Sequence, residues 1–128
     1  MNEKQLQLSF TGWLTRNNIL YYKTQGGSLF TREGKPLRFK SGYSDILVFI
    51  DGEVYFIELK TETGKLRQSQ AEKFSLLKKE GFTNLFILRP SHLKDMMFLK
   101  RNSKNMPWGL LFMKMTLIND DILGKYNV

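Results

Sequence analysis

The chain has 128 residues, a formal net charge of +8, one histidine and no cysteine. This length predicts a single domain, residues 1–128, with a proper hydrophobic core, and the missing cysteines exclude disulfides and thiolate metal sites. The basic excess favours a polyanionic partner, and a simple effect on solubility is the alternative explanation. No apolar run reaches transmembrane length, and no secretory signal is expected at the start of the chain.

Residues 3–17 are predicted to form a first helix with one apolar face that packs on a sheet. The apolar residues of that face are Leu6, Phe10, Trp13 and Leu14. Residues 19–23 predict a short strand, and residues 28–43 a loop or loose hairpin that turns at Gly34-Lys35-Pro36.

The segment from Lys23 to Lys40 is strongly basic, with five basic residues and one acidic residue. A basic, glycine-bearing loop ahead of a hydrolytic site is suited to hold a nucleic-acid backbone, and a plain surface loop is the alternative. The predicted DNA contacts, which include two further basic residues after the hairpin described next, are Arg32, Lys35, Arg38, Lys40, Lys65 and Arg67.

Two apolar runs, residues 44–50 and 53–60, flank Asp51-Gly52, which is a strong signal for a two-residue β-hairpin turn. Alternate residues on one face of this hairpin are apolar, and the other face is apolar except at its charged end. The pattern therefore predicts a sheet covered on both faces, as in α/β folds.

If Asp51 and Gly52 form the loop, Ile50 faces Glu53 and Asp45 falls directly opposite Glu58. Their Cβ atoms would then lie about 4.5–5.5 Å apart on one face of the sheet. Lys60 follows Glu58 by two residues and points to that same face. An odd-length loop would offset the two acids and leave a diagonal pair.

Two carboxylates beside a lysine have a chemical use. Paired carboxylates repel one another unless a proton or a cation intervenes, and Mg²⁺ prefers oxygen ligands of this kind together with substrate phosphates. Lys60 near a cation can lose its proton and act as a base. The group predicts metal-assisted hydrolysis of a phosphodiester, and the alternative is an ordinary polar face on a surface hairpin.

Residues 61–64 read as a loop, and residues 67–80 as a second helix closed by Gly81. Gln70 lies on the apolar stripe of that helix, so its side chain is either hydrogen-bonded locally or aimed at the site. A further strand is predicted over residues 82–89.

A third helix is predicted from a cap at Ser91 to about residue 101, followed by a strand over residues 108–118 and a short tail that begins with a turn at Asn119-Asp120-Asp121. The apolar segments Met96–Leu99 and Trp108–Ile118 predict a dimer interface. The alternative is that they simply cover the second face of the sheet.

Gly42-Tyr-Ser-Asp45 followed by Glu58-Leu-Lys60 resembles the PD-(D/E)xK nuclease superfamily. Thr63-Gly-Lys-Leu-Arg-Gln-Ser-Gln70 narrows the resemblance to the VRR-NUC family, over roughly residues 3–90. Ser44 stands where the family often has a proline, at a position that shapes the turn and binds no metal.

By this resemblance the fold is a restriction-endonuclease-like αβββαβ core over residues 1–90, with a central mixed sheet flanked by helices, and residues 91–128 form a C-terminal helix and strand extension. The implied function is a metal-dependent, structure-specific endonuclease that hydrolyses phosphodiester bonds in branched DNA such as Holliday junctions. It implies a homodimer in the cytoplasm of a bacterium or a phage-infected host, with no membrane partner and no small-molecule cofactor.

The resemblance also implies roles for individual residues. Asp45 and Glu58 would bind Mg²⁺, for which Mn²⁺ can substitute. Lys60 would position or activate water, and Gln70 would support the site. Glu3, on the first helix, would be a further metal ligand, although a carboxylate there is also explained by the helix dipole alone.

Three other functions fit the same sequence. The first is an exonuclease or restriction-like endonuclease on the same scaffold. The second is a non-catalytic nucleic-acid-binding module, and the third is a protein that blocks a host factor through its apolar extension.

Overall fold

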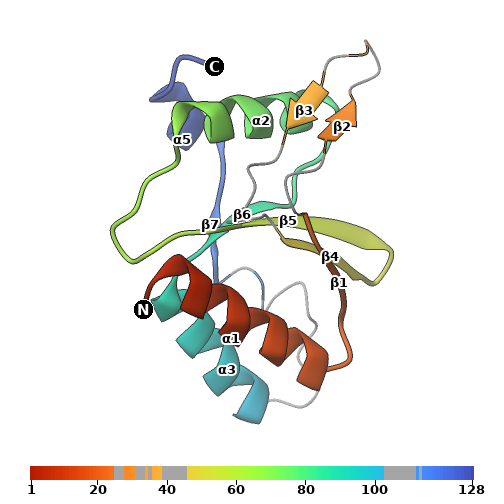
Figure 1. The fold of residues 1–128 in the computed structure, drawn as a ribbon, viewed down its shortest axis with the longest axis vertical. Helices are drawn as coiled ribbons and strands as arrows, with labels where there is room; N and C mark the ends of the chain where they lie inside the picture. The colour runs from red at the N-terminus through yellow and green to blue at the C-terminus, as the bar shows by residue number, and fades with distance from the viewer. Residues whose placement is uncertain (25–27, 31–33, 35, 39–45, 103–111, 113) are drawn as a thin grey trace.

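The computed structural model describes residues 1–24, 28–30, 34, 36–38, 46–102, 112 and 114–128, of which 28–30, 36–38 and 99–102 are described by their backbone only (Figure 1). Its elements are α1 (Glu3–Arg16), β1 (Leu20–Lys23), β2 (Ser28–Phe30), β3 (Pro36–Arg38), β4 (Ile46–Ile50), β5 (Glu53–Leu59), α2 (Gln68–Lys79), β6 (Leu85–Leu88), α3 (Pro90–Asn102), β7 (Thr116–Leu117) and α5 (Asp120–Gly124).

A five-stranded mixed sheet in the order β1-β4-β5-β6-β7 forms the centre of the molecule. The pairs β1–β4, β4–β5 and β6–β7 are antiparallel, whereas β5 and β6 are parallel. Helices α1 and α3 cover one face of this sheet, and α2 with α5 covers the other (Figure 1). The predicted α/β class, with a mixed sheet flanked by helices, is confirmed.

The turn between β4 and β5 has the conformation that its sequence predicts. Asp51 has φ of 53° and Gly52 has φ of 76°, and positive values at both central residues define the type I′ turn of two-residue hairpins. Ile50 accordingly pairs with Glu53, and Ile46 pairs with Ile57. The even-numbered loop on which the site prediction depends is confirmed.

Each face of the sheet has its own apolar core. Ile57 on β5 packs with α1 and α3 in a cluster that includes the fully buried Phe10. Phe56, the neighbour of Ile57, points to the opposite face, where it joins Phe74 of α2 and Leu123 of α5. The alternation of side chains along β5 thus sends successive residues into two different cores.

The second helix matches its prediction, and the third begins before its predicted cap. Gly81 follows α2 with φ of 98°, the left-handed conformation that glycine adopts most easily after a helix. Helix α3 begins at Pro90, so the prediction that Ser91 caps it is wrong. Proline suits the first helical position because it has no N–H and its φ is already helical.

The C-terminal prediction also needs correction. Within residues 108–118, only Thr116–Leu117 is a strand among the described positions, and Phe112 is helical. The predicted tail contains helix α5. The Asn119 side chain caps this helix by accepting a hydrogen bond from the Ile122 N–H at 3.0 Å.

Most of the described apolar extension is buried inside the chain itself. Met96, Phe112 and Met115 belong to the core under α1 and α3, and Ile118 is buried on the α2 side. These four residues therefore cover the sheet, which was the alternative, and a dimer interface in the rest of the extension stays a prediction. Phe98 and Leu117 remain exposed, at 65% and 46%. Across the described residues, no helix is both long and apolar enough to cross a bilayer.

Candidate active site

The candidate site lies at the carboxyl ends of the two parallel strands β5 and β6. Because β5 and β6 run in the same direction, the residues that follow them, Lys60 and Arg89, leave the sheet on the same side. The Lys60 N–H donates to the Leu88 carbonyl at 3.0 Å, which extends the pairing of the two strands by one residue. Carboxyl ends of strands are a common location for functional side chains in α/β sheets.

Glu58 and Lys60 are buried, with only 2% and 5% of their surface exposed. They alternate with apolar residues along β5, so both lie on the face that α2 covers, like Phe56. Charged side chains rarely become this buried unless a partner or a metal offsets the loss of hydration. Their burial argues against the alternative in which they form the polar face of a surface hairpin.

A second lysine reaches Glu58 from α2, and it was not predicted from the sequence. Lys73 is 6% exposed, and its Nζ lies 3.7 Å from Glu58 Oε1. The same nitrogen lies 4.9 Å from the centre of the Phe74 ring. Its signal in the sequence is its position three residues after Gln70, on the stripe that continues with Phe74 and Leu77.

Gln70 is buried beside these groups, and its oxygen has a local partner. Gln70 Oε1 accepts a hydrogen bond from the Arg67 N–H at 2.9 Å, the contact that the third residue of a helix makes in a capping box. The local hydrogen bond offered as one of two alternatives is therefore present. A supporting role of Gln70 in the site stays a prediction.

The other two predicted metal ligands are Asp45 and Glu3. Asp45 lies outside the described residues, although the register of β4 and β5, on which its pairing with Glu58 depends, is observed up to Ile46. Glu3 is half-buried in the first turn of α1, and its role as a ligand stays a prediction.

The chemistry of the donors fits a hard cation. Counting the described residues alone, no group of three or more His, Asp or Glu side chains could hold a metal ion. Glu58 contributes a buried carboxylate, and Asp45, one residue before β4, is the second carboxylate that the prediction requires. Carboxylate oxygens are the ligands that Mg²⁺ and Mn²⁺ prefer.

The loop after Lys60 is held in place by Arg89. Arg89 Nη1 donates to the carbonyl oxygens of Thr61, Glu62 and Gly64 at 2.6, 3.2 and 2.7 Å. A Cβ atom on Gly64 would lie 2.9 Å from Thr61 Oγ1 and 3.7 Å from Lys60 Cδ. Gly64 therefore lies so close to Thr61 that a side chain there would force the loop to shift.

Glu62 ties this loop to the start of α3. Its carboxylate accepts hydrogen bonds from the Ser91 N–H at 2.5 Å and from Ser91 Oγ at 3.1 Å. The bond from the Ser91 backbone holds the pKa of Glu62 below its ordinary value. Because this pKa is lowered on folding, the contribution of Glu62 to stability is present above the unfolded pKa and is lost as the pH falls through the folded one.

Replacing Arg89 with methionine is expected to loosen the 61–64 loop and lower the free energy of unfolding by about 2 kcal/mol, because hydrogen bonds to a charged donor are removed while the stem is kept. Amide hydrogen exchange should become at least about tenfold faster in residues 61–65. Arg16→Met, on an exposed arginine of α1, is the matched control. Unchanged exchange in the Arg89 variant would show that the loop keeps its conformation without the hydrogen bonds from Arg89.

His92 is a hydrogen-bond acceptor at the start of α3. Its Nδ1 accepts a hydrogen bond from the Arg89 N–H at 3.0 Å, and Nε2 lies 3.4 Å from Thr116 Oγ1. Burial, and then the charge of Arg89, lower the pKa of His92 from its ordinary value of 6.5. Both the hydrogen bond and the lowered pKa favour the neutral ring.

The pKa of His92 predicts a loss of stability on mild acidification. Since the folded pKa is below the unfolded value, the free energy of unfolding should be constant above about pH 7 and fall as the pH drops through 6.5 toward the folded pKa. His92→Gln should flatten urea-unfolding free energies measured between pH 5 and 8, because glutamine keeps the acceptor without titrating. An equal slope in both proteins would assign the pH dependence to other groups.

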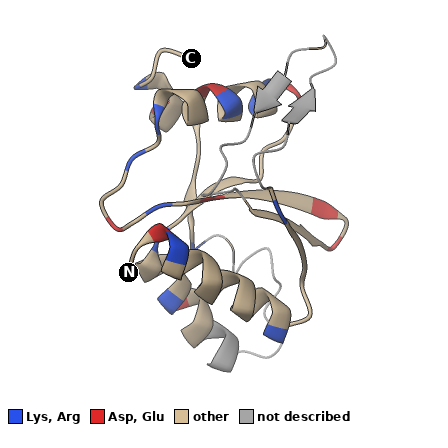
Figure 2. Cartoon of the chain, viewed as in Figure 1, with Lys and Arg blue, Asp and Glu red and all other residues tan. Residues whose placement is uncertain are grey.

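Only some of the residues predicted to contact DNA are described. Lys65 and Arg67 are exposed beside the site, as contact with DNA requires. Arg32, Lys35 and Lys40 lie outside the described residues, and Arg38 is described by its backbone alone. The lysines and arginines that are described spread over both helical layers (Figure 2).

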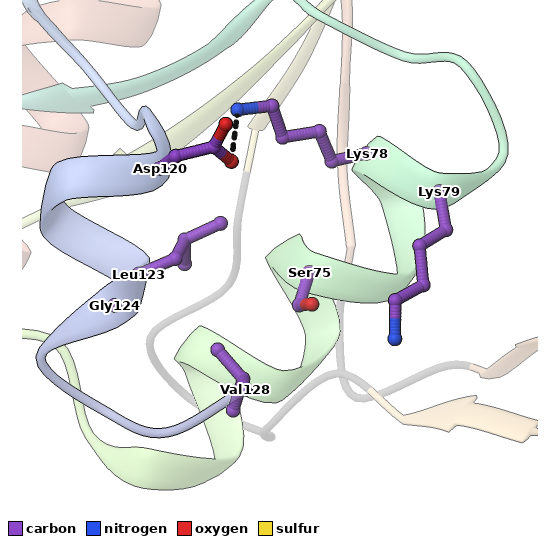
Figure 3. A pocket seen from close by; sticks show the side chains of 7 residues that line it. All are labelled: Ser75, Lys78, Lys79, Asp120, Leu123, Gly124 and Val128. Carbon is purple, nitrogen blue, oxygen red and sulfur yellow. Dashed lines mark hydrogen bonds and ion pairs between the residues drawn. The ribbon is translucent and has the colours of Figure 1, made fainter.

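A hollow of about 420 Å³ lies between α2 and α5, away from Glu58 and Lys60. Lys78 Nζ and Asp120 Oδ1 form an ion pair of 2.6 Å across it (Figure 3). The lining residues are Ser75, Lys78, Lys79, Asp120, Leu123, Gly124 and Val128. Because the ion pair joins the two helices, the hollow belongs to their packing.

Comparison with known proteins does not add to this geometry: no protein-family model, curated protein sequence or solved structure matches the chain.

Proposed function

We propose that this chain is a metal-dependent deoxyribonuclease that hydrolyses phosphodiester bonds at the carboxyl end of β5. The observation that carries the proposal is the burial of Glu58 and Lys60, two residues apart on one face of the sheet. An ion pair with a purely structural role can lie anywhere along a strand. A catalytic acid and lysine must lie near the carboxyl end of the strand, where a substrate can reach them. The PD-(D/E)xK resemblance of the same residues supports this proposal.

The order of elements also supports a restriction-endonuclease-like core. A helix, three antiparallel strands, a helix and a parallel fourth strand follow one another as α1, β1, β4, β5, α2 and β6. The small β2–β3 hairpin is inserted between β1 and β4. Under this proposal residues 91–128 are an addition that covers both faces of the core.

The proposed reaction gives roles to Glu58, Asp45, Lys60 and Arg89. Glu58 and Asp45 would hold the cation, and Mg²⁺ bound there would supply a Lewis acid that offsets the charge developing on the phosphoryl oxygens. Lys60 orients a water molecule for in-line attack on phosphorus and, in its deprotonated form, accepts a proton from it. The P–O bond opposite the attacking water breaks, and the leaving oxygen takes up a proton from solvent. Arg89 would act indirectly, by holding the loop that follows Lys60.

A non-catalytic DNA-binding module is the main rival function. Binding of the phosphate backbone needs exposed lysine and arginine, and it has no use for a buried carboxylate such as Glu58. Glu58 is therefore expected in an enzyme and unexpected in a binder. We further propose that the substrate is branched DNA and that a homodimer cuts its two strands, because one chain supplies one site.

One incubation separates these functions. Labelled linear, flapped and four-way DNA are each mixed with the protein in Mg²⁺ or in EDTA. The nuclease proposal expects internal cuts that need Mg²⁺, and preference for four-way DNA would support the branched substrate. Products released one nucleotide at a time would indicate an exonuclease, equal cutting of linear duplex a restriction-like enzyme, and binding without cutting a DNA-binding module.

The basic segment is expected to act through phosphates. Changing Arg32, Lys35, Arg38 and Lys40 to glutamine should weaken binding to all DNA sequences in Ca²⁺. The slope of log K against log salt should fall by about 0.9 for each phosphate that the variant no longer neutralises. Four exposed lysines, Lys4, Lys79, Lys94 and Lys125, give a control with the same reduction in charge. Equal slopes for the two variants would show that only net charge matters.

A further inference from the structure

Lys73 places a second buried ammonium group against the carboxylate that the proposed metal site requires. Its Nζ lies 3.7 Å from Glu58 Oε1, with side-chain exposures of 7% and 2% for the two residues. No role in water activation or phosphate binding described above involves this lysine. Its position therefore needs a separate explanation.

The surroundings of Lys73 are built to hold a cation. Its nitrogen lies 4.9 Å from the centre of the Phe74 ring, and an aromatic face attracts a desolvated ammonium group. Phe74 is itself fully buried in the core between α2 and the sheet. The ring and the carboxylate together offset part of the cost of burying the charge.

The spacing of residues along α2 explains why the Lys73 side chain faces the sheet. Gln70, Lys73, Phe74 and Leu77 follow the i, i+3, i+4, i+7 spacing of one helix face, and all four are buried. The Gln70–Arg67 hydrogen bond fixes the start of the helix one turn earlier. Lys73 is thus directed at the sheet by the same stripe that packs α2 against it.

We infer that Lys73 is a built-in counter-ion of the proposed metal site. In the metal-free protein its ammonium group neutralises Glu58, and the same group opposes a divalent cation that binds to Glu58. Lys73 therefore stabilises the metal-free fold and weakens metal binding. The inference rests on the proposed nuclease function for its metal, but the coupling between Lys73 and Glu58 does not.

A space-filling role of Lys73 and an electrostatic role predict different effects of substitution. If the side chain of Lys73 only filled space, methionine, which is similar in length and apolar, would replace it at no cost in stability. If its charge matters, methionine leaves less positive charge around a buried carboxylate, which is costly. The two roles therefore differ in the metal-free stability of Lys73→Met and in its affinity for metal.

The test compares Lys73→Met, Lys73→Arg and the parent protein by thermal unfolding in EDTA and by calorimetric titration with Ca²⁺ in the absence of DNA. Lys73→Met should unfold roughly 10 °C lower in EDTA and bind Ca²⁺ at least about tenfold more tightly, because the competing charge is gone. Lys73→Arg, which keeps the charge, should resemble the parent. Equal unfolding temperature and equal Ca²⁺ affinity in Lys73→Met would overturn the inference.

Glu58→Gln provides the matched background. Adding Lys73→Met to it should cost much less than in the parent, since the carboxylate is no longer charged. If Lys73→Met alone does not fold in EDTA, recovery in Ca²⁺ or in the Glu58→Gln background supports the inference, and failure in both contradicts it. If the parent neither binds Ca²⁺ nor cuts DNA, the nuclease proposal fails, while the coupling measured in EDTA still decides whether Lys73 is the counter-ion of Glu58.

Discussion

Glu58→Gln is expected to reduce Mg²⁺-dependent DNA cleavage by a factor on the order of a thousand or more, because it removes a metal-binding charge at nearly constant shape. The variant should fold with reduced stability, since glutamine fills the same buried space but no longer offsets the buried charge of Lys73. Single-turnover rates on the preferred substrate measure the effect. Asp45→Asn and Lys60→Met should reduce the rate similarly.

Glu72→Gln is the control for this prediction. Glu72 lies on the exposed side of α2, so the substitution makes the same chemical change without touching the site. DNA binding in Ca²⁺ should be close to that of the parent in both variants. Full cleavage by Glu58→Gln would remove Glu58 from the mechanism and leave the site prediction without its central residue.

The second large effect concerns the metal ion. Excess EDTA should abolish cleavage, and Mg²⁺ or Mn²⁺ should restore it, because the inferred ligands are carboxylate oxygens. Ca²⁺ should support DNA binding with little turnover, since its larger and more flexible coordination shell orients water poorly. Cleavage assays across the three ions, with binding measured in parallel, check this. Undiminished cutting in EDTA would contradict a metal-dependent reaction.

The hairpin shows why part of the site could be predicted from the sequence. A two-residue loop depends on local backbone preferences, and Asp51-Gly52 has those for a type I′ turn. Once the loop is fixed, the pairing of β4 with β5 follows by counting, and so does the face on which Glu58 and Lys60 lie. Their burial, in contrast, depends on α2, whose position over the sheet is not a local property.

Lys73 and Arg89 were missed for that reason. Lys73 approaches Glu58 only because α2 crosses β5, and 15 positions separate the two residues in the sequence. Arg89 reaches the 61–64 loop only because β6 runs parallel to β5. Each contact is set by packing between distant elements, which short-range patterns do not encode.

The strand predicted over residues 108–118 was wrong for another reason. A short apolar run can be a strand or a buried helix, and periodicity does not separate the two. The described part of residues 108–118 contains a helical position at Phe112 and a strand only at Thr116–Leu117. Buried apolar residues such as Phe112 and Met115 also resemble an interface in the sequence when the core they complete is unknown.

The most direct test of the proposed site is to locate the metal. Crystals of the protein soaked in Mn²⁺ and measured at the manganese absorption edge give an anomalous peak wherever the ion binds. The proposed site predicts a peak within coordination distance of Glu58 and Asp45, and its disappearance in Glu58→Gln crystals treated in the same way. A peak elsewhere, or none at Glu58 in fully soaked crystals, would contradict the claim that these residues form a metal-dependent nuclease site.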